Sequence, residues 1–231
     1  MKYMGSKNRI AKYILPIMLE HKKEGQWWVE PFVGGANMID KVDGNRLGAD
    51  SNKYLIALLK EMQTQVPFNP PHIGEQEYKN IQKNKDNYPE WLVGYVGFNL
   101  SFAAKFFGGY GRDKAGIRNY ENEAQQNLLA QQNLLAQVNF ICCDYKSLDI
   151  PKNSLIYCDP PYFNTTKYKT GINHLEFWQW CRDKYNEGHT VFVSEYNAPE
   201  DFTCVWEKEV NNSLTKNTGA KKGIERLFTL S

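Results

Sequence analysis

The chain has 231 residues, enough for one α/β domain with or without a sizeable insertion, and its 42% hydrophobic and 14% aromatic content excludes global disorder. A formal net charge of +2 does not demand a polyanionic partner, but it leaves room for a local basic face. Five cysteines without a C-x-x-C pair and four scattered histidines favour neither a disulfide framework nor a metal site.

The first quarter of the chain predicts a βαβ unit. Residues 27–33 (WWVEPFV) have the composition of a short buried strand that ends at two glycines, and we expect residues 36–42 to form the next helix. Residues 46–49 predict a second strand, which ends in an acid, and the apolar spacing of residues 52–63 indicates a helix after it. This order of elements is typical of a parallel sheet covered by helices.

Composition changes near Val66, where the segment VPFNPPHIG is rich in proline. No clean alternation of strands and helices follows until about residue 118. We therefore predict that residues 67–118 form an inserted subdomain, mostly helical or irregular. Residues 1–66 and 119–231 would then form the main domain.

A tandem hexapeptide, QNLLAQ, occupies residues 126–131 and again residues 132–137. Its six-residue period does not match the helical repeat: Leu128 and Leu135, seven residues apart, share a helix face, while Leu129 and Leu134 diverge from each other. We interpret the segment as a surface helix with a narrow apolar edge. Two units are too few to sustain a coiled coil.

Alternation of strands and helices resumes after the repeat. The apolar patterns predict strands at residues 138–143, 154–158, 189–194 and 227–230, and a helix at residues 175–186. The two halves together predict an α/β fold with one doubly wound sheet that the subdomain interrupts.

The glycine turn after the first strand, within EPFVGGANM at residues 30–38, lets the backbone approach a ligand closely. Open α/β sheets bind nucleotides at this edge, and Asp50 at the end of the next strand is placed to accept hydrogen bonds from ribose hydroxyls. The turn has no basic residue and is not a phosphate-binding loop of the triphosphate type. These features predict a cofactor that contains a nucleoside.

A second unusual turn, SLIYCDPPYFNTTKY at residues 154–168, runs a buried strand directly into Asp159 and two prolines. The prolines fix two φ angles and lack N–H groups, so the loop presents rigid acceptors to a substrate that carries hydrogens. The ring of Tyr162 offers a flat surface for stacking. The stretch therefore indicates recognition of an aromatic amine, while residues 163–168 are either a lid or a plain connection.

The chain contains an N-terminal YMGSK, then EPFVGG, then DPPY after a strand, and finally a C-terminal ERLFTL. A known family has these motifs in the same order. In these motifs the chain resembles the class alpha, Dam-like DNA adenine methyltransferases over most of its length. The resemblance implies a Rossmann-like methyltransferase sheet with an inserted target-recognition subdomain. It also implies S-adenosylmethionine as methyl donor and the 6-amino group of a flipped-out adenine in double-stranded DNA as acceptor.

The resemblance also implies roles for individual residues. The cofactor would be bound by Tyr3, Lys7, Phe32, Gly34, Gly35, Asp50, Asp144 and Asp159, with Lys7 complementing the carboxylate of the donor. Asp159 and the Pro160 carbonyl would accept the hydrogens of the adenine amino group, and Tyr162 would stack on the base. No metal is expected.

Basic side chains of the insertion and of the segment KNTGAKKGIER are candidates for contacts with DNA phosphates or base edges. They are Lys105, Arg112, Lys114, Arg118, Lys221 and Lys222. We expect the second segment, residues 216–226, to be a loop before the last strand. For residues 98–118, a small aromatic core with solvated basic side chains is the alternative.

Two other functions remain open at this point. The same fold and cofactor could serve cytosine N4, RNA or a protein amide, and the chain could also be a catalytically silent DNA-binding module. The N-terminus lacks a signal peptide and no apolar stretch reaches the length of a membrane span, so we expect a cytoplasmic protein of a bacterial or phage-infected cell without a membrane partner. The DNA recognition sequence and the oligomeric state do not follow from these motifs.

Overall fold

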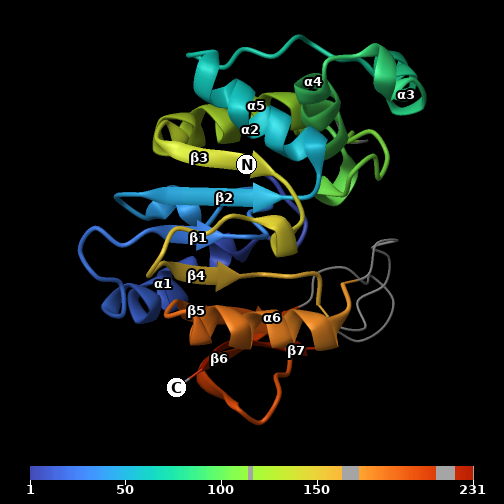
Figure 1. The fold of residues 1–231 in the computed structure, drawn as a ribbon. Coiled ribbons are helices and arrows are strands. Elements are labelled where there is room, and N and C mark those ends of the chain that lie inside the picture. Colours follow the sequence, from blue (N-terminus) through green and yellow to red (C-terminus); the bar gives the residue numbers. More distant parts are fainter. Residues whose placement is uncertain (114–116, 163–171, 212–221, 231) are drawn as a thin grey trace.

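The computed structural model describes residues 1–113, 117–162, 172–211 and 222–230, which form a seven-stranded sheet in the order β3-β2-β1-β4-β5-β7-β6 (Figure 1). The strands are β1 (Trp28–Glu30), β2 (Arg46–Asp50), β3 (Val138–Cys142), β4 (Leu155–Cys158), β5 (Thr190–Glu195), β6 (Phe202–Asn211) and β7 (Lys222–Leu230). Strands β1 to β5 are parallel, β7 is antiparallel to β5, and β6 is antiparallel to β7. The predicted α/β class with a Rossmann-like sheet is confirmed.

The strand order reverses between β1 and β4. The chain proceeds from β1 outward to β2 and β3, then returns to the other side of β1 with β4 and β5. Because the connections leave β1 and β4 in opposite directions, a crevice opens beyond the carboxyl ends of these two strands. The register pairs Val29 with Ile156, so the segments that follow Glu30 and Cys158 leave the sheet side by side.

The helices are α1 (Ala11–Glu20), α2 (Lys53–Thr64), α3 (Glu75–Lys83), α4 (Glu90–Gly94), α5 (Tyr120–Gln132) and α6 (His174–Asn186). Single 3₁₀ or π turns occur at η1 (Lys7–Arg9), η2 (Ile39–Lys41), η3 (Lys85–Asn87), η4 (Tyr95–Asn99), η5 (Phe102–Ala104), η6 (Asn133–Leu135) and η7 (Tyr145–Ser147). No helix within the described ranges is long and apolar enough to cross a membrane.

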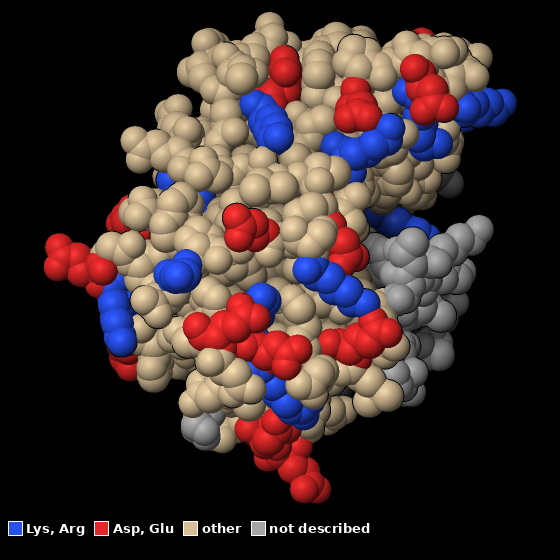
Figure 2. All heavy atoms as spheres, in the orientation of Figure 1, with Lys and Arg blue, Asp and Glu red and all other residues tan. Residues whose placement is uncertain are grey.

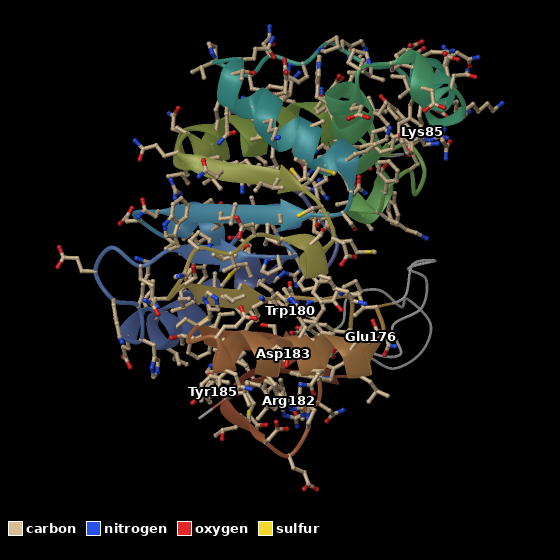
Figure 3. All side chains as sticks on the ribbon, viewed as in Figure 1. Lys85, Glu176, Trp180, Arg182, Asp183 and Tyr185 are labelled. Carbon is tan, nitrogen blue, oxygen red and sulfur yellow. The ribbon has the colours of Figure 1, made fainter. Side chains whose placement is uncertain are left out.

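Alternate residues of the central strands bury their side chains on opposite faces of the sheet. Trp28 and Leu155 pack with the side chains of α1, α2 and α5, whereas Val29 and Ile156 pack with those of α6. Figure 3 shows α6 with Trp180 among its labelled residues; this side chain is buried, whereas Glu176 and Asp183 are exposed. The sheet is therefore covered on both faces, as its continuous apolar strands require.

Three sequence expectations about these elements were wrong. Residues 36–42 form turns and the short η2 instead of a helix, because Gly34 (φ +48°) and Ala36 (φ +54°) have left-handed backbone conformations. Residues 222–226 belong to β7 and not to a loop. Strand β6 was missed because Phe202 is its only fully buried side chain among residues 202–210, which leaves little apolar alternation.

The inserted segment is helical, as expected, with α3 and α4 above α2 and β3 in Figure 1. Its buried side chains, which include Phe68, Tyr78, Val93 and Tyr95, belong to the same hydrophobic cluster as those of α1 and α2. The aromatics of the insertion therefore extend the main core. The division into two domains and the recognition role of residues 67–118 remain predictions.

The two copies of the hexapeptide have different environments on α5 and η6. Leu128 and Leu135 are fully buried, as the predicted apolar edge requires. Gln132, the first residue of the second copy, is also buried: its Nε2 donates to the Met62 and Gln65 carbonyls at 2.6 Å each, and its Oε1 accepts from the Phe68 N–H at 2.9 Å. These bonds satisfy backbone groups at the end of α2 and the start of the insertion.

We predict that Gln132→Ala lowers the free energy of unfolding by about 2 to 4 kcal/mol, because it leaves buried backbone groups without partners. Gln126 has the same place in the first copy and is exposed. Gln126→Ala is therefore the matched control and should change stability by less than about 0.5 kcal/mol. Urea unfolding measures both values, and equal effects would contradict the proposed role of Gln132.

Candidate active site

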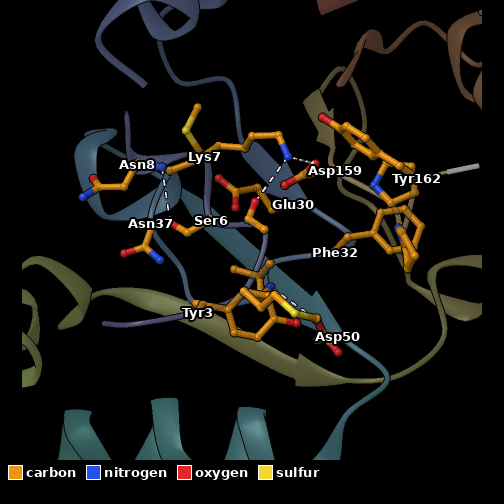
Figure 4. A pocket seen from close by; sticks show the side chains of 18 of the residues that line it. Tyr3, Ser6, Lys7, Asn8, Glu30, Phe32, Asn37, Asp50, Asp159 and Tyr162 are labelled. Atoms are coloured by element: carbon orange, nitrogen blue, oxygen red, sulfur yellow. Dashed lines mark hydrogen bonds and ion pairs between the residues drawn. The ribbon is translucent and has the colours of Figure 1, made fainter. Parts of the chain in front are cut away.

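An open cavity of about 2040 Å³ lies beyond the carboxyl ends of the parallel strands. Every cofactor and base residue predicted from the sequence lines it: Tyr3, Lys7, Phe32, Gly34, Gly35, Asp50, Asp144, Asp159, Pro160 and Tyr162. The N-terminal segment, the loop after β1, the end of β2, the segment after β3 and the loop after β4 supply these residues (Figure 4). The reversal of strand order therefore brings the two unusual turns into one site.

The glycine turn is shaped by Tyr3. A Cβ atom on Gly34 would lie 2.8 Å from Tyr3 Cε1, and one on Gly35 would lie 2.6 Å from Tyr3 Cβ. Only glycine allows this approach, and the positive φ of Gly34 favours glycine as well. From the far side, Gln131 Nε2 donates to the Gly35 and Ala36 carbonyls at 3.1 and 2.9 Å. Sequence patterns gave no indication of this support from Gln131.

Asp50 is held by backbone donors at the end of β2. Its Oδ2 accepts from the Gly34 N–H at 3.3 Å and its Oδ1 from the Asn52 N–H at 2.9 Å. Burial raises the pKa of Asp50, and the two backbone hydrogen bonds oppose this change. The carboxylate is therefore fixed in orientation beside the glycine turn.

Lys7, which is buried, and Asp159, which is partly exposed to the cavity, form an ion pair with Lys7 Nζ 2.8 Å from Asp159 Oδ1. The Nζ also donates to the Gly5 carbonyl and lies 3.9 Å from Glu225 Oε2. Burial alone would lower the pKa of Lys7, but the two carboxylates outweigh it and raise this pKa. Burial raises the pKa of Asp159 to about 6 although Lys7 opposes it. We expected Lys7 to complement a cofactor carboxylate; the structure pairs it with Asp159.

Three groups surround the ring of Tyr162. Its hydroxyl donates to Glu225 Oε2 at 2.7 Å, and the Tyr196 ring contacts it edge to face with the centroids 4.6 Å apart. Lys7 Nζ lies 4.4 Å from the ring centroid, which is a cation–π distance. Sequence reasoning missed Tyr196 and Glu225; Glu225 is the first residue of ERLFTL, and that motif by itself indicated no partner.

Glu30 was also missed as a buried acid of this site. Its Oε1 accepts from Trp28 Nε1 at 2.8 Å, and the side chain is almost fully buried. Burial raises the pKa of Glu30 well above its ordinary value, which favours the protonated form. Asp144, in contrast, is exposed at the cavity rim, where it accepts from the Lys146 N–H.

The predicted DNA-binding side chains are scattered. Lys105, Arg112 and Arg118 are exposed, but Arg112 is paired with Glu75 at 2.9 Å and Arg118 is paired with Glu123 at 2.8 Å. Lys114 and Lys221 lie outside the described residues, as do residues 163–168 and the side chain of Lys222. On the face shown in Figure 2, acidic and basic side chains are interspersed.

These groups can recognise a planar amine. A carboxylate and a proline carbonyl are hydrogen-bond acceptors, and an aromatic ring beside them can stack on a flat substrate. Among the described residues, no group of three or more His, Cys, Asp or Glu side chains could hold a metal ion. The glycine turn and Asp50 form a second half of the site, suited to a nucleoside.

Three comparisons relate the chain to known proteins. A sequence model of the family described as D12 class N6 adenine-specific DNA methyltransferase matches residues 3–199. The Type II methyltransferase M.FokI of Planomicrobium okeanokoites is 24% identical over 204 residues, which are 77% of this chain and 31% of that protein. The chain thus spans about a third of the length of this relative. A crystal structure of SMU.472, a candidate methyltransferase complexed with SAH, has a TM-score of 0.44 and 11% identity over 99% of this chain and 54% of that one.

We predict that Lys7→Met raises the pKa of Asp159 from about 6 by a further 1 to 3 pH units or so, because the positive charge that favours the carboxylate is lost. An NMR titration of the labelled aspartate carboxyl carbons measures this value. Lys2→Met is the control, because Lys2 pairs with Glu123 and not with Asp159. An unchanged pKa in Lys7→Met would contradict the ion pair.

Proposed function

The chain belongs to the D12 class of N6 adenine-specific DNA methyltransferases, and we propose that it transfers a methyl group from S-adenosylmethionine to the 6-amino group of adenine in double-stranded DNA. The observation that supports this most is the shared cavity. Asp159 and Tyr162 lie beside the glycine turn and Asp50, so a base and a nucleoside cofactor can meet there.

The cofactor half of the site fits S-adenosylmethionine, which supplies an activated methyl group on its sulfonium. Gly34 and Gly35 let the turn pack directly against Tyr3, and the Asp50 carboxylate beside this turn is oriented to accept from ribose hydroxyls. Tyr3 and Phe32 provide apolar walls, and Asp144 lies at the rim. These side chains bind and align; they take no part in proton transfer.

The base half would act on the adenine amino group. Its nitrogen lone pair is delocalised into the ring, so acceptance of its hydrogens by Asp159 and the Pro160 carbonyl favours charge on nitrogen as the bond to carbon forms. Tyr162 would stack on the base. The side chains of the cofactor half and of the base half would together align the methyl group and the amine for in-line transfer. The amino group is not accessible to such a site inside a duplex, so the adenine would be flipped out.

Contacts with DNA are proposed for the basic side chains Lys105, Arg112, Lys114, Arg118, Lys221 and Lys222. Arg118 also lines the cavity, whereas Lys105 and Arg112 do not. If Arg118 released Glu123 and bound a DNA phosphate instead, it would link the insertion to the duplex. Such an enzyme would act on DNA in the cytoplasm of a bacterial or phage-infected cell.

We predict that Asp159→Ala lowers the methylation rate by about 10²- to 10⁴-fold, because the acceptor of the amino hydrogens is lost. The assay incubates protein, labelled donor and DNA, then digests the DNA and identifies the methylated nucleoside. N6-methyladenine is expected from the unsubstituted protein. Label in cytosine, in RNA or in protein alone, or a variant that keeps its activity, would contradict the proposal.

We also predict a loss of turnover as the pH falls through about 6, because Asp159 must be ionised to accept hydrogens and its pKa is raised to about 6. Initial rates at saturating DNA and donor between pH 5 and 9 measure this dependence. Circular dichroism at each pH controls for unfolding. A rate that stays constant down to pH 5 would show that the ionised carboxylate is not required.

A further inference from the structure

Glu225 is a largely buried acid of the site and lies beyond residue 199, where the family match ends. Strand β7 places it there. Because β7 is antiparallel to β5 and pairs Arg226 with Glu195 at the end of β5, its preceding residue reaches beyond the carboxyl edge of the parallel strands. Glu225 therefore lies at the edge of the sheet where the loop after β4 begins.

The contacts of Glu225 connect it to both groups proposed to hold the base. Its Oε2 accepts from the Tyr162 hydroxyl at 2.7 Å and lies 3.9 Å from Lys7 Nζ. Lys7 in turn is 2.8 Å from Asp159 Oδ1. The side chain of Glu225 is only 15% exposed, so these contacts are largely shielded from water. A hydrogen bond to an ionised carboxylate in such surroundings is stronger than one between neutral groups.

We propose that Glu225 is a positioning residue: it fixes the stacking ring of Tyr162 through the phenol hydroxyl and holds the Lys7 ammonium beside Asp159. This inference rests on the proposed function, in which Tyr162 stacks on the base and Asp159 accepts its amino hydrogens. Glu225 touches neither reactant in this account. Its effect reaches the reaction through the orientation of Tyr162 and the charge near Asp159.

The geometry makes this role separable from a purely structural one. Tyr162 turns about two side-chain torsions, and its hydroxyl bond to Glu225 restrains both, with the Tyr196 ring at its edge. Loss of the bond should therefore matter for base stacking and not for the cofactor half, where Tyr3 and Asp50 have other partners. A residue that only stabilised the hairpin would affect both halves alike.

The kinetic test compares Glu225→Ala, Glu225→Gln, Tyr162→Phe and the double variant Glu225→Ala/Tyr162→Phe. We expect Glu225→Ala to lower kcat/KM for DNA about 10- to 100-fold, the range for one hydrogen bond to a charged group, with KM for the donor unchanged. Glu225→Gln keeps an acceptor oxygen and should recover part of the loss. In the double variant the fold loss in kcat/KM for DNA should be much smaller than the product of the two single losses.

Two further measurements address stacking and charge. With 2-aminopurine at the target adenine, Glu225→Ala should change the fluorescence of the bound, flipped base, because the ring beneath it is no longer fixed. Among the described residues, the titratable groups that interact electrostatically with Asp159 are Lys7, Glu225, Glu30, Tyr157, Cys158 and Tyr162. Glu225→Gln removes one negative charge from this set and should move both the Asp159 titration seen by NMR and the acid limb of the rate profile to lower pH.

The control is Glu187→Gln, an exposed carboxylate that pairs with Lys184 at the opposite edge of the sheet and should leave all readouts unchanged. Losses that multiply in the double variant, an unaltered fluorescence, or an unmoved Asp159 titration would each overturn the proposal. The NMR titration does not depend on turnover. If the unsubstituted protein fails to methylate DNA, the proposed function fails, while the titration still decides whether Glu225 acts on Asp159.

Discussion

The site depends on one largely buried ion pair, Lys7 with Asp159, which joins the N-terminal segment to the end of β4. Neither charge could be buried alone without a cost of several kcal/mol, so each requires the other to be in place. The segment that carries Lys7 also brings Tyr3 against the glycine turn. The half of the site proposed for the cofactor and the half proposed for the base are therefore both lined by the same docked segment.

The topology of the sheet explains why these segments meet. Glu30 and Cys158 end the two adjacent strands at which the strand order reverses, so the turns that follow them open onto the same crevice. The antiparallel strands β6 and β7 form a further wall of the cavity, because they extend beyond the carboxyl edge of the parallel strands. Through this wall Glu225 reaches Tyr162, and the described part of the cavity includes residues from both ends of the chain.

Three acids of one cavity differ in their electrostatic environment. Glu30 is buried with an indole donor, and its pKa is raised well above the ordinary range. Asp50 accepts from two backbone N–H groups, and Asp159 faces an ammonium. The acid proposed to bind ribose hydroxyls is thus held by neutral donors, whereas the acid proposed to accept the amino hydrogens of the substrate has a cationic partner. The three acids therefore differ in electrostatic environment because of their burial and their interaction partners, and not because one is Glu and two are Asp.

The sequence by itself determined the features that depend on local chemistry: the apolar runs of β2 to β5, the glycine turn, and the acid with two prolines after β4. These were predictable because strand periodicity and the φ limits of glycine and proline act over a few residues. The tertiary structure alone decided which glutamines of two identical hexapeptides are buried, that residues 36–42 are not helical, that β6 exists, and that Lys7 and Glu225 converge on Asp159 and Tyr162. Each of these depends on partners far away in the chain, and such contacts have no local signature in the sequence.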